Sequence, residues 1–195
     1  VPGLPALPPD GETILWQGRP AGFALAREAY KVNWIAGYFA LLVLYRGYSG
    51  WDAGGVPMAL AYGLPYAAIG ATTYVLLCVG AIWQARATVY TITTARVAMR
   101  IGAALAITVT LPFKQIVSAA LDLRKSGTGT IALQVAPPAR LSKLVCWPHI
   151  RPWKWRCQPA LRCIPDAAEV ARILGDAAEA RVSIPTVTLA TPAAA

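Results

Sequence analysis

The sequence predicts an α+β membrane protein in which a transmembrane helical hairpin is followed by an antiparallel β-barrel capped by a C-terminal α-helix. Two observations lead to this fold class. Hydrophobic residues make up 56% of the 195 residues and charged residues 14%, a composition too apolar for an ordinary soluble domain. In addition, long uncharged runs lie in the first half of the chain, whereas short β-type segments and one amphipathic helical pattern fill the second half.

Residues 1–31 are expected to form an N-terminal cytoplasmic segment. Its first part, residues 1–9, is rich in proline, which predicts disorder. This stretch has no basic region followed by an apolar one, so it does not resemble a cleavable signal peptide. Membrane insertion is therefore expected to use internal spans of the chain.

Residues 32–85 are predicted to form the transmembrane hairpin. The second span, about 57–83, lies within a run of 28 uncharged residues at 56–83. As one helix this run would be about 42 Å long, which exceeds the roughly 30 Å hydrocarbon core of a bilayer. Tilting, extension into the interface or a kink at Pro65 would absorb the excess.

The first span, about 32–48, is shorter. Only 14 uncharged residues separate Lys31 from Arg46, so a crossing requires both cations to reach the headgroups. Tryptophans and tyrosines near both ends favour a crossing, because these residues are typical of membrane interfaces. A re-entrant or interfacial helix is the alternative. The glycine-rich residues 46–55 are expected to form the connecting turn.

Basic residues on both sides of the hairpin predict its orientation. Three precede the first span and three closely follow the second, whereas the connection holds one, Arg46. Because basic residues are enriched on the cytoplasmic side of spans, both termini are expected in the cytoplasm. The predicted arrangement is therefore a helical hairpin with a short periplasmic turn.

A stripe of small residues follows one face of the second span. A small residue recurs there at every fourth position, namely Ala59, Gly63, Ala67 and Ala71. Such a stripe allows another helix to approach closely. The partner helix is either the first span of the same chain or a helix of a different membrane protein.

Residues 86–182 are predicted to form a cytoplasmic domain that begins with β-strands. The runs TVYTIT and RVAMRIG, separated by a turn at Thr94 and Ala95, indicate a β-hairpin. More strands are expected in the short β-type segments that follow, at 107–113, 116–124 and 130–135.

The domain is predicted to end with an amphipathic helix after Pro165. The apolar residues that share one face at helical spacing are Val170, Ile173, Leu174 and Ala177. Residues 183–195 form a tail rich in alanine and proline, to which no structure is assigned.

These segments together resemble a known family. DGETILWQGRP at 10–20, the membrane hairpin, VYTITTARVAMRIG, LPFKQIVSAAL and GTGTIAL look like a bacterial pleckstrin-homology-like (PH-like) domain attached to membrane spans. WPHIRPWKWR at 147–156 and LRCIPDAAEVARIL at 161–174 are similar to the photosynthetic-complex assembly proteins of purple phototrophic bacteria, which are encoded beside the reaction-centre H subunit. The resemblance covers about residues 8–182.

The resemblance implies a PH-like barrel in the cytoplasm and a role in building the reaction-centre and light-harvesting 1 core complex. The implied partners are reaction-centre subunits, including the H subunit, and light-harvesting 1 subunits. The implied location is the bacterial inner membrane, in its photosynthetic or intracytoplasmic form, which the chain would cross more than once. The implied activity is binding of a partner rather than catalysis.

The segment KLVCWPHIRPWKWRC at 143–157 is predicted to be a docking loop at the membrane surface. It combines three tryptophans with several basic residues, and tryptophan and arginine are enriched in interface hot spots. Its prolines stiffen the loop and lower the cost of ordering it on binding. The expected docking residues are Trp147, Arg151, Trp153, Lys154, Trp155 and Arg156. The alternative is a structural role, with the tryptophans packed on the barrel.

The charge of the second half indicates which partners to expect. Residues 86–195 carry 14 basic and five acidic side chains, so anionic membrane lipids are an expected partner. A lipid-binding module without a protein client is therefore an alternative function. Nucleic acid is not expected, because the cations lie beside the spans and among interfacial tryptophans. An enzyme is not expected, since no phosphate-binding loop or nucleophile–base motif is found.

His149 is a weak candidate for a ligand of zinc or bacteriochlorophyll. It is the one histidine of the chain, and its spacing from Cys146, Cys157 and Cys163 fits no common zinc pattern. No metal and no cofactor are therefore expected. A bacteriochlorophyll carrier that uses His149 is kept as a third hypothesis.

Overall fold

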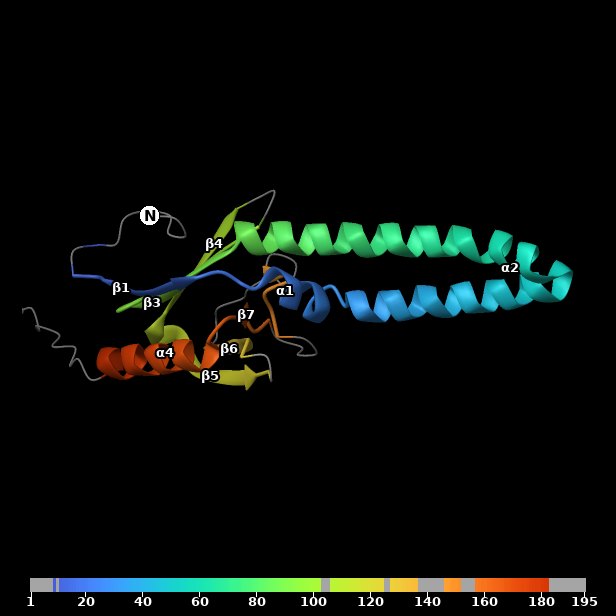
Figure 1. Ribbon diagram of the computed structural model, residues 1–195. Coiled ribbons are helices and arrows are strands. Elements are labelled where there is room, and N and C mark those ends of the chain that lie inside the picture. The colour runs from blue at the N-terminus through green and yellow to red at the C-terminus, as the bar shows by residue number, and fades with distance from the viewer. Residues whose placement is uncertain are drawn as a thin grey trace, which may run out of the picture.

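The computed structural model describes residues 9, 11–102, 106–124, 127–136, 146–151 and 157–182. Figure 1 shows a domain of strands and short helices from which one long helical element projects. In chain order the elements are β1 (Ile14–Gly18), α1 (Gly22–Glu28), α2 (Val32–Ala87), β2 (Val89–Thr93), β3 (Arg96–Ile101), β4 (Ile107–Pro112), the 3-10 helix η1 (Phe113–Gln115), β5 (Ile116–Leu123), β6 (Gly129–Val135), β7 (Ala160–Ile164) and α4 (Ala167–Val182).

α2 folds back on itself as two antiparallel arms. Gly54 and Gly55 have non-helical backbone angles and divide the 56 residues of α2 into arms 32–53 and 56–87, which lie side by side in Figure 1. Gly55 has a φ of +67°, a value that glycine adopts without steric cost. The predicted turn over 46–55 is therefore too long, because two adjacent glycines reverse the chain and the helix continues to residue 53.

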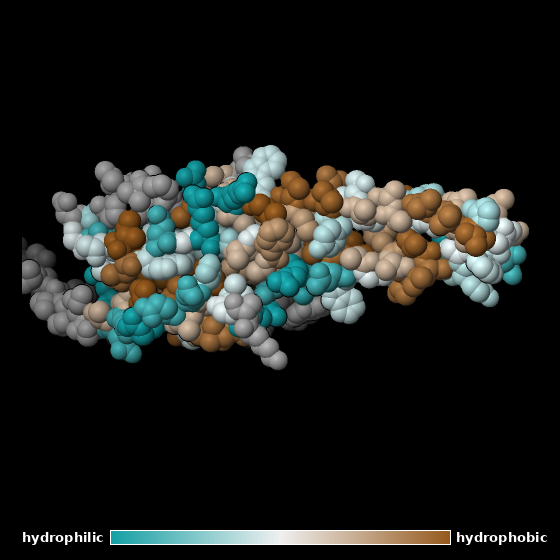
Figure 2. Space-filling view, in the orientation of Figure 1, coloured by the Kyte–Doolittle hydropathy of each residue, from teal (hydrophilic) through white to brown (hydrophobic). Residues whose placement is uncertain are grey.

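α2 is the one helix in the described part of the chain that is long and apolar enough to cross a membrane. Only 11% of its most apolar 18-residue stretch is buried inside the protein. A core helix of a soluble protein would be mostly buried, so this exposure favours association with lipid. Figure 2 shows apolar side chains along the arms and hydrophilic side chains gathered over the domain.

The domain contains two antiparallel sheets, with strand orders β1-β2-β3-β4 and β5-β6-β7. The predicted β-hairpin is confirmed, since β2 pairs with β3 and Thr91 lies opposite Ala98. The three β-type segments that follow are confirmed as β4, β5 and β6. Within the described residues no strand pair joins the two sheets, so the expected β-barrel is observed as two packed sheets.

Besides the short η1, three elements are not predicted by the sequence: β1, α1 and β7. β1 pairs with β2, with Gln17 opposite Thr91, so the expected N-terminal segment contributes an edge strand to the domain. Glu12, just before β1, accepts two hydrogen bonds from Arg96 of β3, each 2.9 Å long. These long-range contacts, which a local pattern does not contain, hold five residues in strand form.

One apolar core joins the two sheets to α4. It includes Met99 from the first sheet and Leu161 from the second, both fully buried. Burial of each such side chain contributes about 1.5–3 kcal/mol. The predicted apolar face of α4 is confirmed at Val170, Leu174 and Ala177, which are buried, whereas Ile173 is half-buried.

Candidate partner-docking face

The predicted docking loop begins at the end of the domain from which α2 projects. The indole ring of Trp147 packs edge-on against the ring of Tyr30, with the centroids 5.2 Å apart. Tyr30 lies two residues before Val32, the first residue of α2, so Trp147 lies beside the base of the first arm. Trp147 is 50% exposed. Half of its surface is therefore free to contact a partner or lipid.

The remaining predicted docking residues are placed only in part. Arg151 is exposed, and its backbone N–H donates to the carbonyl oxygen of Gln158 at 3.0 Å. The other predicted docking residues, Trp153, Lys154, Trp155 and Arg156, lie outside the described residues. Trp147 and Arg151 are thus the predicted docking residues that the structure describes, and both are exposed.

Exposed basic side chains surround the base of α2. Arg27 on α1, Lys31 at the start of α2 and Arg86 in its last turn are all exposed. Arg100 is also exposed, and it lies opposite Val89, two residues after the end of α2. We call these four residues and Trp147 the hairpin-proximal rim. The rim combines positive charge with an indole ring, which suits an anionic membrane surface or a partner beside it.

Beneath the loop, buried hydrogen bonds fix its position. His149 is fully buried. Its Nδ1 atom is hydrogen-bonded to Tyr90 Oη, and its Nε2 atom is hydrogen-bonded to Thr88 Oγ1 at 3.1 Å. Thr88 donates its hydroxyl proton to the carbonyl oxygen of Gln84 at 2.9 Å, so it accepts from Nε2–H. Nδ1 then accepts from Tyr90, whose oxygen accepts from the backbone N–H of Arg162 at 3.2 Å. This relay connects β7, β2, the loop and the last turns of α2.

Arg162 ties the same loop to α1. Only 7% of Arg162 is exposed, and its guanidinium donates to the carbonyl oxygen of Pro148 at 3.0 Å. It also lies 4.0 Å from the carboxylate of Glu28, which in turn lies 3.4 Å from Arg124. A buried charge requires such partners. The loop, α1, β7 and the base of α2 therefore form one connected unit.

His149, Tyr90 and Cys163 of this buried junction do not titrate near neutral pH. Burial, with a contribution from the neighbouring Arg162 cation, lowers the pKa of His149 to about 3. Burial also raises the pKa of Tyr90. Burial and the nearby Glu28 carboxylate raise the pKa of Cys163 to about 12. At pH 7 these groups are neutral, so the junction offers neither a thiolate nucleophile nor a histidine base of ordinary strength.

The geometry does not fit His149 as a ligand of a metal or a pigment. Both of its ring nitrogens are engaged by protein hydroxyl groups, whereas a ligand needs one nitrogen lone pair directed at the metal. In the described ranges, no group of three or more His, Cys, Asp or Glu side chains could hold a metal ion.

The small-residue stripe of α2 faces the opposite arm. Gly63 is buried, and a Cβ atom there would lie 3.6 Å from the carbonyl oxygen of Val43. Ala67 and Ala71 border a hollow of about 270 Å³ between the arms, and Ala59 packs beside the first arm through its carbonyl oxygen. Of the two alternatives for the stripe, this arrangement favours packing within the hairpin.

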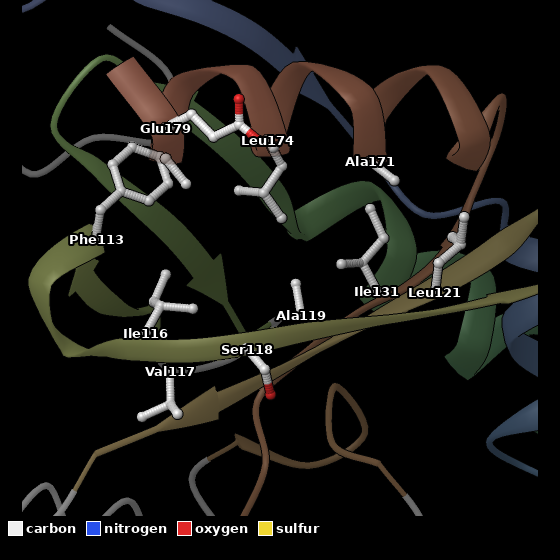
Figure 3. Close-up of a pocket in the computed structure, with 12 residues that line it drawn as sticks. Phe113, Ile116, Val117, Ser118, Ala119, Leu121, Ile131, Ala171, Leu174 and Glu179 are labelled. Carbon is white, nitrogen blue, oxygen red and sulfur yellow. The ribbon is translucent and has the colours of Figure 1, made fainter. Parts of the chain in front are cut away.

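A separate apolar groove lies between α4 and β5. Figure 3 shows Phe113, Ile116, Ala171 and Leu174 around this groove, whose volume is about 350 Å³. β5 is an edge strand of its sheet, and Val117 on it is 64% exposed. The residues that line the groove are mostly apolar, so the groove could contact an apolar surface but presents few polar side chains for chemistry.

The sequence does not predict the junction residues Glu28, Tyr90 and Arg162. One signal for Arg162 is present in the run ALRCI at 160–164, where a single charge stands among apolar residues. Such a charge indicates a buried site that requires a partner. The partner itself, Glu28, is far away in sequence and no local pattern identifies it.

Two packed antiparallel sheets followed by a C-terminal helix define a PH-type domain, here joined to a long apolar hairpin. Residues 35–178 match the family model of the Bacterial PH domain, so the chain belongs to the bacterial PH domain family. The resemblance to a PH-like domain is confirmed. The match includes most of α2.

Comparison with known proteins also finds a full-length relative. The chain is 47% identical over 201 residues to the "Uncharacterized 23.7 kDa protein in puhA 5'region" of Rhodobacter capsulatus. The alignment covers 100% of this chain and 92% of the relative. No solved structure matches the chain.

Proposed function

We propose that the protein is a non-enzymatic assembly factor or accessory subunit that binds and stabilises the reaction-centre and light-harvesting 1 core complex at the membrane. The observation that carries this proposal is the firm attachment of the docking loop to the base of an apolar hairpin. Trp147 packs on Tyr30, and His149 is hydrogen-bonded to Thr88 directly after α2. A partner that touches the rim is thereby held at a defined height above the membrane.

The membrane part of the proposal is that α2 crosses the bacterial inner membrane twice, with both termini in the cytoplasm. The rise of a helix places Tyr62 and Trp83 about 32 Å apart along the second arm. This separation matches a hydrocarbon core of about 30 Å bounded by aromatic residues. The first arm, 32–53, has a similar length of about 33 Å.

The relative from Rhodobacter capsulatus supports the photosynthetic setting. Its printed name places it in the 5' region of puhA, a photosynthesis gene region. Because the two proteins are 47% identical over the whole of this chain, we extend that setting to this protein. Reaction-centre subunits, including the H subunit, and light-harvesting 1 subunits are the proposed partners.

A second candidate function is a module that binds anionic lipid without a protein client. The four exposed cations of the hairpin-proximal rim favour it, since each adds about 1 kcal/mol of attraction to an anionic leaflet. A bacteriochlorophyll carrier lacks such support, because both ring nitrogens of His149 are engaged.

Affinity purification in mild detergent tests the leading proposal. We expect the wild-type chain to recover reaction-centre or light-harvesting 1 subunits, and Trp147→Ala to lower the recovered amount about tenfold, as for an interface hot spot. Trp51→Ala is the matched control, since Trp51 is also exposed but lies at the tip of α2. Repeated absence of these subunits with the wild type would refute the assembly role. A loss confined to liposome binding would favour the lipid module.

A further inference from the structure

Arg46 lies between the arms of α2, and no acceptor for its Nε–H is found among the described residues. Its guanidinium carbon is 5.2 Å from the ring centroid of Tyr62 and 5.6 Å from that of Tyr66. Its Nε atom is buried without a hydrogen-bond partner. No acidic side chain in the described part of the chain forms an ion pair with it. Cation–π contacts stabilise the guanidinium but use none of its five N–H donors.

The surroundings of Arg46 place it at the depth of lipid headgroups. Its neighbour Tyr62 is the aromatic residue at the far end of the proposed crossing of the second arm, about 32 Å from Trp83. Three strongly exposed aromatic residues lie close to Arg46 on the first arm: Tyr45, Tyr48 and Trp51. Such residues are typical of the headgroup region. Arg46 therefore faces the leaflet that lies away from the domain.

A cation at headgroup depth, with no acceptor for Nε–H among the described residues, has lipid phosphates within reach. A phosphodiester accepts two N–H groups of arginine at once, and tyrosine hydroxyls add further donors. We infer that Arg46, Tyr62 and Tyr66 form a binding site for the phosphodiester headgroup of a phospholipid in the leaflet away from the domain. This inference rests on the proposed insertion of α2 as a two-span hairpin.

Native mass spectrometry of the purified full chain tests this site. The chain is released from detergent micelles that contain either phosphatidylglycerol or a glycolipid without phosphate. We expect the wild type to retain phosphatidylglycerol in preference to the glycolipid, and Arg46→Gln to lower the retained fraction about tenfold, as for loss of a charge-assisted hydrogen-bond pair. Arg46→Lys keeps the charge and should retain an intermediate fraction. Arg181→Gln removes an exposed arginine from the last turn of α4, outside the hairpin-proximal rim, and should leave retention unchanged.

Equal retention by Arg46→Gln and wild type would overturn the site. The site would also be overturned if Arg46→Gln retained the lipid but lost a co-purified membrane protein, because the acceptor of Arg46 would then be a partner's carboxylate. Carbonate extraction of membranes that contain the protein tests the proposed two-span hairpin separately from the Arg46 lipid site. Release of wild type by carbonate would remove the hairpin proposal as well, whereas firm insertion with unchanged lipid retention would remove the Arg46 site alone.

Discussion

Tyr90 is the residue through which the first sheet, the second sheet and the docking loop are connected. It is fully buried, donates to His149 and accepts from the backbone of Arg162. Tyr90→Phe leaves both of these partners buried without their hydrogen bonds, which should cost about 2–4 kcal/mol of unfolding free energy. Thermal unfolding of the purified chain in detergent, followed by circular dichroism, measures this loss.

The matched control for this change is Tyr45→Phe, because Tyr45 is 66% exposed on α2. We expect its melting temperature to stay close to that of the wild type, and that of Tyr90→Phe to fall by several degrees. Equal melting temperatures for the two variants would contradict the relay.

His149 predicts a pH dependence of stability. Its folded-state pKa of about 3 lies below the unfolded value of about 6.5, so folding favours the neutral ring. Above pH 6.5 this contribution is fully present. As the pH falls from 6.5 to 3, the unfolded chain binds a proton that the folded chain does not, and stability is lost. At pH 5 the loss should be about 2 kcal/mol.

His149→Gln isolates this effect, because glutamine does not titrate. The variant is expected to be less stable than the wild type at pH 7.5, since it disturbs the relay, but to lose less stability between pH 7.5 and pH 5. Melting temperatures at the two pH values measure the difference. An equal loss in both proteins would show that His149 is not held neutral by burial.

At the scale of elements, glycines set the distance between the arms of α2. A Cβ atom on Gly70 would lie 2.7 Å from Cβ and 2.8 Å from Cγ of Phe39, closer than van der Waals contact. Gly70→Ala should therefore force the arms apart and cost about 1–3 kcal/mol. The thermal midpoint of the helical circular dichroism signal in detergent reports this cost.

Gly37→Ala provides the control on the same element. A Cβ atom there meets nothing within 4 Å, so the change should be neutral or stabilise α2 by up to about 1 kcal/mol through helix propensity. The close approach of the arms would be in doubt if both variants behaved alike.

The elements also show how far the sequence alone leads. β2 and β3 are predictable because β-branched residues fill two runs with a short turn between them, and α4 is predictable from the spacing of Val170, Leu174 and Ala177. β1 and β7 are not predictable, since each owes its strand form to distant partners. The two arms of α2 are predictable from composition. The position at which the chain reverses, Gly54 and Gly55, is identified only by the backbone angles of the structure.

The sequence predicts which loop forms the candidate site, but it does not predict the buried contacts that hold this loop in place. Trp147 is identified by the density of tryptophans and cations around it. The junction beneath it joins Glu28, Tyr90, His149 and Arg162, which lie in four separate parts of the chain. Only the tertiary fold brings them together, and it gives His149 a supporting role instead of a ligand role.

At the scale of the whole molecule, we propose that an apolar hairpin holds a PH-type domain against the cytoplasmic face of a membrane. The hairpin and the domain are connected at the base of α2. The base of α2 is hydrogen-bonded to the docking loop through Thr88 and His149, and the exposed cations of the rim surround the same base. The domain would then stay at one height and orientation above the lipid, which suits a protein that positions partners.

Labelling of single cysteines with a membrane-impermeant maleimide tests this claim most directly. Cys78 and Cys157 are first replaced by alanine, while Cys146 and Cys163 are buried and have thiol pKa values raised by burial to about 12. Asp52→Cys then reports on the tip of α2 and Lys114→Cys on the far end of the domain, both at exposed positions. We predict that intact spheroplasts label Asp52→Cys only and that inside-out vesicles label Lys114→Cys only. Labelling of both positions from the same side would contradict the account.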